Sequence, residues 1–313
     1  TSSLFNHNDE SLLLITAWGQ QDTPLSDAES WKSRKKHVEE VASLYGHDTS
    51  FIKSNYSEFL NWPVVNFLSP ELPAWRIYAV DGIGWAGLVA PIFFAKNCSA
   101  LYIASANSWY YSYIDCINPF VDNSIRFGNY RVLHDQFECT RLDKALFIAR
   151  ACEKKGFKKP HIKVCQFTST FGDINCCACK KCLLTMLELC AAGANHREYG
   201  FNVSLATAVK RSMHLLRRPI DYEPLWHFMD IQLTIKRNIK KYSRSTIAKL
   251  TPFLKRNLLK VQIRNTEQIV KSKVDWNDFS KIVPSVVIPS DLLDEKWEVE
   301  RRASAALNRP WSL

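Results

Sequence analysis

The sequence predicts an α/β fold with a mostly parallel sheet, followed by a helical C-terminal region. Short apolar runs alternate with longer amphipathic stretches over roughly the first half of the chain, which is the order of parallel strands joined by helices. After residue 182 the pattern becomes helical, and part of it is strongly basic. The length of 313 residues, with 46% apolar residues, suits one large domain or two modest ones.

The first predicted elements are a strand, a helix and a second strand. Residues 11–17 form a buried strand in this prediction, because Leu12 and Ile15 bound a run of four aliphatic residues. Residues 27–45 follow as a helix that Asp27 can cap and Gly46 can end. A short strand over residues 49–53 completes a strand-helix-strand unit.

The remaining elements continue the alternation. An apolar helix is expected over residues 83–95, with Pro91 as the cause of a kink or an irregular entry. The further predicted strands are 100–105, 130–134 and 161–167, and the further predicted helices begin with 141–154 and 183–192. We expect an α/β domain over residues 1–199 and a basic helical region over residues 200–313.

The charge distribution supports that boundary. The net charge is +10, and between residues 201 and 270 fourteen Lys or Arg stand against four acidic residues, so the rest of the chain is balanced. Pairs such as Lys236-Arg237 and Lys240-Lys241 are interleaved with apolar residues. This pattern fits attachment to nucleic acid or an anionic membrane surface, but a helical cap whose charges face water is favoured over either of them.

The cysteine spacing predicts a metal site. Cys176, Cys179 and Cys182 form a C-x2-C-x2-C array, and Cys165 lies eleven residues upstream of it. Four thiols can close a tetrahedral structural zinc site, here an insert over residues 165–182. Buried thiols or a single redox pair are the alternative. Cys177 either replaces Cys176 as a ligand or sits beside it.

Two further features of the sequence indicate the cellular compartment of the protein. The chain has no run of about twenty uninterrupted apolar residues and no signal peptide, so a transmembrane segment is not expected. Ten cysteines are then interpreted as reduced thiols in a cytoplasmic protein, one group of them metal-bound.

Polar residues follow two of the predicted strands. Ser105 and Asn107 end one strand, and Arg141 and Lys144 begin the helix after the next. Ligands of open α/β sheets bind at this edge, and two cations on the first turn of a helix suit a phosphate. A solvated helix start with one ion pair is the competing interpretation.

Three glycines, Gly82, Gly84 and Gly87, match the dinucleotide-binding spacing G-x-G-x-x-G. No acidic residue follows the next strand to hold a ribose, so close helix packing explains them better.

Five stretches in this order resemble the PP-loop ATP pyrophosphatase superfamily, and within it the 7-cyano-7-deazaguanine synthase-like group. They cover roughly residues 10 to 195 and read SLLLITAWGQQDTPLSD, LYIASANSWY, NPFVD, VLHDQFECTRLDK and HIKVCQFTSTFGDINCCACKKCLLTML. The cysteine block and the HD-x4-TR-x2-K block are the most specific of these stretches.

The resemblance implies a three-layer α/β sandwich of the adenine nucleotide α-hydrolase type. It also implies an enzyme that binds ATP with Mg²⁺, releases pyrophosphate and activates a carboxylate- or carbonyl-bearing small molecule as an adenylate. Arg141 and Lys144 would contact phosphates, Ser105 and Asn107 would line the nucleotide or substrate crevice, and the zinc would be structural.

The chain departs from that pattern in three places. The SGG-x-DS loop of the superfamily is absent and would lie just before Thr1, so we expect an N-terminally truncated fragment that binds ATP weakly and does not turn over. Asn107 stands where related proteins often have His, and Cys177 where they often have Gly. The alternative function is a non-enzymatic, zinc-stabilised module that binds nucleic acid or a partner through its basic region.

Overall fold

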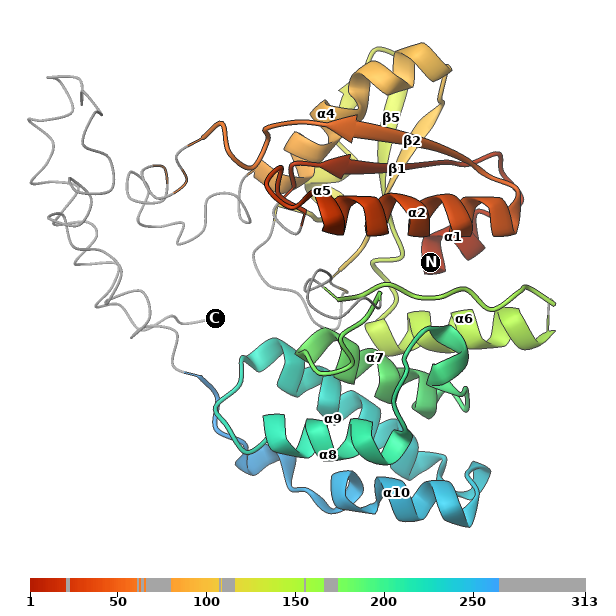
Figure 1. Ribbon diagram of the computed structural model, residues 1–313, viewed down its shortest axis with the longest axis vertical. Coiled ribbons are helices and arrows are strands. Elements are labelled where there is room, and N and C mark those ends of the chain that lie inside the picture. Colours follow the sequence, from red (N-terminus) through yellow and green to blue (C-terminus); the bar gives the residue numbers. More distant parts are fainter. Residues whose placement is uncertain are drawn as a thin grey trace, which may run out of the picture.

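A computed structural model of the protein describes residues 1–20, 23–60, 62, 65, 80–106, 108, 116–154, 156–165 and 174–264. It is a mixed α/β structure with small sheets of parallel strands, as the sequence predicts. Figure 1 shows two parts, with the strands in the upper part and a group of helices below them. None of the helices in the described part is long and apolar enough to cross a bilayer.

The first sheet pairs β1 (Leu13–Trp18) with β2 (Asp48–Lys53) in parallel. The helix between them, α2 (Ala28–Tyr45), packs against both strands. It begins and ends as predicted, since the Asp27 carboxylate accepts the Ser30 N–H at 3.0 Å and Gly46 takes a left-handed conformation. A short helix, α1 (Ser2–Asn6), precedes β1. β1 is half-buried along its whole length, where a buried strand was expected.

The second sheet is built around β5 (Tyr130–Asp135). It pairs in parallel with β3 (Ala100–Ala104) and in antiparallel with the short strand β4 (Arg126–Phe127). Helix α4 (Asp81–Lys96) precedes this sheet and contains Pro91, and the short helix α5 (Pro119–Asp122) packs against β5.

The three glycines of the G-x-G-x-x-G match lie inside α4, and no separate loop holds them. A Cβ atom at Gly84 would overlap the Tyr56 ring, and one at Gly82 would come within 2.8 Å of the Asp122 carboxylate. Close packing therefore explains two of these glycines, as the sequence indicates.

The helical part surrounds α7 (Lys180–Ala191), in which every residue from 182 to 191 is buried. Three of its neighbours are α6 (Arg141–Lys154), α8 (Leu205–Leu215) and α9 (Tyr222–Arg237), and α10 (Arg244–Lys255) packs on α8. Short 3-10 turns complete this part: η2 (His196–Tyr199), η3 (Ile239–Lys241) and η4 (Leu258–Lys260). Helices on both sides of residue 200 share this core.

The apolar residues of the basic segment mostly face inward. Leu225, Phe228, Ile231 and Ile235 of α9 are buried in the common core, whereas Leu233 is exposed. The interpretation of this segment as a packed helical layer is therefore correct for its apolar side.

One predicted strand is wrong. Residues 161–165 carry no strand, although their sequence favours one; residues 166 and 167 of the same prediction lie outside the described part. The backbone here is held by other groups. The Ile162 N–H donates to the Tyr199 carbonyl at 2.9 Å, and the Asn175 side chain forms hydrogen bonds with neighbouring backbone N–H and carbonyl groups. These partners replace a strand ladder.

Candidate metal centre and polar groups at the strand ends

Four cysteine sulfurs converge at the start of α7. The Sγ atoms of Cys165, Cys176, Cys179 and Cys182 all lie within 4.8 Å of one another. Three of the separations are 3.4 Å (Cys179 to Cys182), 3.9 Å (Cys176 to Cys182) and 4.0 Å (Cys165 to Cys179). A tetrahedral ion with metal–sulfur bonds of about 2.3 Å places its sulfurs about 3.8 Å apart. The cluster can therefore hold one metal ion, and convergence of four thiols favours this over a redox pair.

The local backbone explains the convergence. Cys179 is the N-cap residue of α7 and Cys182 lies in its first turn, so two thiols face the positive end of the helix. The Cys179 N–H also donates to the Cys176 sulfur at 3.3 Å. Both effects stabilise thiolates, which are the form that binds metal.

Asn175 ties the metal cluster to the preceding segment. Its side chain is almost fully buried, and its Oδ1 accepts the N–H groups of Val164 and Cys165 at 3.1 and 3.3 Å. Its Nδ2 donates to the carbonyls of Ile162 and Gly200. Asn175 thus fixes Cys165 beside the other three ligands. Sequence reasoning missed it, and its position directly before the cysteine array was the available signal.

The structure decides between Cys176 and Cys177. Cys177 has a φ of 53°, a left-handed conformation, and its sulfur is not part of the cluster. Its carbonyl accepts the Arg211 guanidinium at 2.8 Å. Cys176 therefore belongs to the candidate ligand set, and Cys177 is the residue that turns the chain.

Hydrogen bonding within the cluster shifts the pKa values of two of its thiols in opposite directions. The hydrogen bond between Cys179 and Cys182 lowers the pKa of Cys179 to about 5. The same contact, together with burial, raises the pKa of Cys182. One thiolate thus forms at neutral pH, and binding of a metal would release the protons of the others.

Two of the residues predicted to lie at the strand ends, Ser105 and Lys144, contact each other. The Ser105 N–H donates to the Asp135 carbonyl at 2.9 Å, which places Ser105 at the joint ends of β3 and β5. The Lys144 ammonium donates to the Ser105 carbonyl at 2.7 Å. Burial lowers the pKa of Lys144, which is half-buried on the first turn of α6. Asn107 lies outside the described residues.

Arg141 points toward α7. Its Nε lies 3.3 Å from the Glu188 carboxylate and its Nη2 donates to the Thr185 hydroxyl, also at 3.3 Å. The Glu188 side chain is 3% exposed, and burial raises its pKa although Arg141 opposes that shift. Arg141 therefore neutralises a buried acid, which agrees with the alternative of a helix start with one ion pair. Whether it also contacts phosphate stays a prediction.

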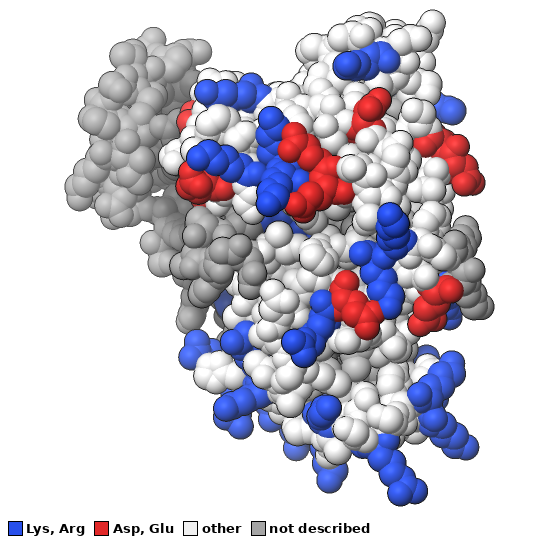
Figure 2. Space-filling model, turned by 45° about the vertical axis from the view of Figure 1, so that its right-hand side comes forward, with Lys and Arg blue, Asp and Glu red and all other residues white. Residues whose placement is uncertain are grey.

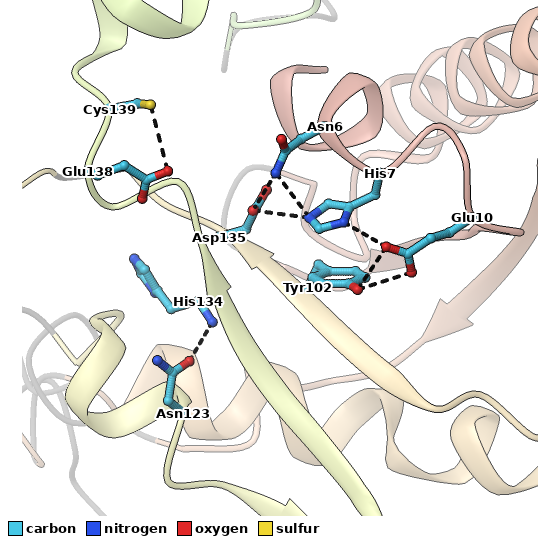
Figure 3. A network of polar contacts seen from close by, with 9 residues as sticks. All are labelled: Asn6, His7, Glu10, Tyr102, Asn123, His134, Asp135, Glu138 and Cys139. Carbon is cyan, nitrogen blue, oxygen red and sulfur yellow. Dashed lines mark hydrogen bonds and ion pairs between the residues drawn. The ribbon is translucent and has the colours of Figure 1, made fainter.

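A polar network borders the strand ends. The His7 Nδ1 lies 2.8 Å from the Glu10 carboxylate and its Nε2 lies 3.1 Å from the Asp135 carboxylate, and the ring stacks on Tyr102 with ring centroids 3.8 Å apart. Figure 3 shows Asp135 turned toward this network and His134 turned to the other side of β5. Sequence reasoning did not predict this arrangement.

His134 belongs to a second, fully buried pair. Its Nδ1 lies 2.6 Å from the Asp122 carboxylate, and neither side chain is exposed to solvent. The pair joins two of the stretches singled out by sequence, NPFVD and VLHDQFECTRLDK. Its role as a structural contact between α5 and β5 follows from this placement.

Comparison of the chain with protein families, with curated proteins and with solved structures finds no significant match.

Proposed function

We propose that the protein is an ATP-dependent, adenylate-forming enzyme of the PP-loop ATP pyrophosphatase type, with a structural zinc ion held by Cys165, Cys176, Cys179 and Cys182. One observation carries the nucleotide part of the proposal. In the described part of the chain, the half-buried Lys144 ammonium makes one hydrogen bond, to the neutral Ser105 carbonyl, and no ion pair. A cation in this position at the ends of parallel strands favours an anionic ligand such as a phosphate.

The zinc would support the fold and take no part in the reaction. Four cysteine thiolates fill a tetrahedral ion and leave no position open for water or substrate. The cluster lies at the start of α7, and α7 packs on α6, the helix that carries Lys144. Metal binding would thereby fix the position of α7, and with it the helix α6 that carries Lys144. Zinc thiolates of this kind also fit a reducing compartment such as the cytoplasm.

In the proposed reaction, an oxygen of the substrate carboxylate or carbonyl forms a bond to the α-phosphorus of ATP–Mg²⁺. The bond from that phosphorus to the bridging oxygen breaks, and pyrophosphate leaves with the electron pair. Lys144 would bind a phosphate oxygen, and the Ser105 carbonyl would hold the ammonium in place. Ser105 and Asn107 would border the crevice.

The proposal includes the pyrophosphate loop and a finer fold. Proteins of this type hold the pyrophosphate in an SGG-x-DS loop between their first strand and first helix. The two small sheets would then belong to one three-layer sandwich.

ATP binding by the complete reading frame tests the proposal. Lys144→Ala is expected to weaken ATP–Mg²⁺ binding, measured by titration calorimetry, by about 10- to 150-fold, since a lost charged hydrogen bond costs about 1.5–3 kcal/mol. The matched control is Lys158→Ala, an exposed lysine just beyond α6. Equal affinity in both variants, or a reading frame without the loop, would overturn the enzyme proposal and leave a non-enzymatic module.

A further inference from the structure

We propose that the outer side of the helical part binds the phosphate backbone of nucleic acid, a function separate from the nucleotide site. The surface in question, called the basic face below, comprises the exposed cations of α8, α9, α10 and the turns beside them. Its members are Lys210, Arg211, Arg217, Arg218, Lys236, Arg237, Lys240, Lys241, Arg244, Lys249, Lys255 and Lys260.

Acidic residues do not neutralise this surface. Between residues 201 and 264 there are three, against fourteen Lys or Arg. Asp221 and Glu223 lie near Lys180, at 3.3 and 3.8 Å, and Asp221 also lies 3.6 Å from Arg264. Asp230 is half-buried. The charge of the basic face is therefore uncompensated.

The cations are densest where α9 ends and α10 begins. Lys236 and Arg237 occupy the last turn of α9, Lys240 and Lys241 lie in η3, and Arg244 opens α10. All five are exposed, and within the described ranges none of them makes an ion pair. Figure 2 shows Lys and Arg side chains along the bottom of the molecule, where this view has no acidic side chain. Such a field attracts a polyanion.

The packing of these helices argues against a membrane as the partner. A helix that binds a bilayer surface needs a free apolar side to insert. The apolar side of α9 is buried through Phe228, Ile231 and Ile235, and that of α10 through Leu250 and Phe253. The helices thus offer water mainly their charged side.

The neutral residues among the cations favour phosphate over an acidic protein. Ser243, Ser245 and Asn257 are exposed between the basic residues. Hydroxyl and amide groups share the binding of phosphate oxygens with Lys and Arg in nucleic-acid complexes. A row of cations and neutral donors matches a regularly repeating phosphate chain.

The basic face is also remote from the strand ends. Figure 1 places α10 at the bottom of the helical part and the sheets at the top. Binding of nucleic acid there would not require an intact ATP site, so this proposal and the proposed function can fail separately.

Fluorescence anisotropy with labelled DNA and RNA duplexes of about 30 base pairs tests the inference. We expect binding whose affinity falls steeply with salt, because phosphate contacts release counterions. Changing Lys236, Arg237, Lys240 and Lys241 together to Glu should flatten the slope of log K against log salt by about 3 to 4 and weaken binding about a thousandfold at 0.1 M salt.

The control makes the same charge change elsewhere. Lys32, Lys36, Lys96 and Lys158 are exposed outside the basic face, and their change to Glu should leave most of the binding intact. Retained zinc and an unchanged unfolding transition verify that both variants are folded. If the fourfold variant does not fold, Lys240→Gln and Lys241→Gln are each expected to reduce the slope by about 0.9.

Several results would overturn the inference. These are no binding by the unaltered protein at about 0.05 M salt, equal losses in the two fourfold variants, and displacement of the duplex by polyglutamate as readily as by unlabelled nucleic acid. Binding to anionic vesicles in place of nucleic acid would identify the basic face as a membrane surface and would also refute it.

Discussion

The strand-bearing part and the helical part of the molecule are stabilised in different ways. Among the described residues, the largest fully buried side chains all lie between Leu183 and Phe253, in the helical part. In the strand-bearing part, the cluster between α4 and the second sheet has Ala86, Ile103 and Val132 as its buried members, and β1 is half-buried along its length. The strand-bearing part also contains buried or partly buried polar contacts, such as the His7–Asp135 and His134–Asp122 pairs.

This difference places the apolar core and the candidate ligand-binding groups in different parts of the molecule. Apolar burial stabilises by about 25 cal/mol per Å², so the large buried side chains of the helical part contribute strongly to the folding free energy. The strand ends keep polar groups with unused hydrogen-bonding capacity, and such groups are suited to ligands.

The metal cluster should have the largest effect, because it holds the start of the central helix α7. Cys176→Ala is expected to release about one zinc per chain and to unfold the region around α7, since structural zinc contributes on the order of 10 kcal/mol in small domains. Metal analysis and thermal unfolding of the purified protein measure both.

Cys177→Ala is the matched control and should keep its zinc, because the Cys177 sulfur is outside the cluster. A native protein without zinc whose four clustered thiols titrate freely would show that the metal assignment is wrong.

Matched leucine truncations compare the two parts directly. Leu187→Ala in α7, where the side chain is fully buried, should lower the free energy of unfolding by about 2–5 kcal/mol. Leu13→Ala in half-buried β1 should cost about half as much or less. Urea titrations give both values, and similar losses at the two sites would contradict the contrast.

Arg141→Ala should destabilise the protein through Glu188. The change leaves a buried carboxylate without its partner, which costs about 2–3 kcal/mol here, less than for a fully buried pair because Arg141 is partly exposed. Loss of Arg141 also removes a charge that opposes the raised pKa of Glu188.

The pH dependence identifies the cause. A carboxyl whose folded pKa is raised becomes neutral as the pH falls, so the penalty of Arg141→Ala should be greatest near neutral pH and should fade below the pKa of Glu188. The double variant Arg141→Ala/Glu188→Gln should recover most of the loss. A penalty that does not change with pH would point to lost packing.

Much of the fold followed from local patterns. α2 was predictable because its cap, Asp27, and its end, Gly46, are set by their own neighbours. The four clustered cysteines followed from spacing, since a short turn brings such thiols together. The strand over residues 161–165 was wrong because Asn175 and Tyr199, distant along the chain, take the backbone groups that a ladder would use.

Some polar contacts between residues far apart in the sequence were likewise not predictable from local patterns. Lys144 and Ser105 could be placed at one sheet edge from the order of strands, and they meet there. The partner of Arg141 is 47 residues away on α7, and the partner of His134 is on α5, so only the packed structure reveals them. The boundary near residue 200 stays a prediction.

The smallest effect concerns His7 at the edge of the strand-bearing part. Burial alone lowers the pKa of His7, but hydrogen bonds to Asp135 and Glu10 outweigh it and raise the pKa above its usual value. Because the folded pKa is raised, this stabilisation is fully present below about pH 6.5 and is lost as the pH rises through the folded pKa. We expect a loss of a few tenths to about 1 kcal/mol for this partly exposed group.

The comparison of wild type with His7→Gln across about pH 5.5 to 8.5 isolates that contribution, because titration of the cysteines affects both proteins equally. The difference in unfolding free energy between the two should shrink as the pH rises. His214→Gln, at an exposed histidine of α8, is the control for the substitution itself. A difference that stays constant with pH would mean that His7 acts through its stacking on Tyr102, which is a packing contact like those of the helical part.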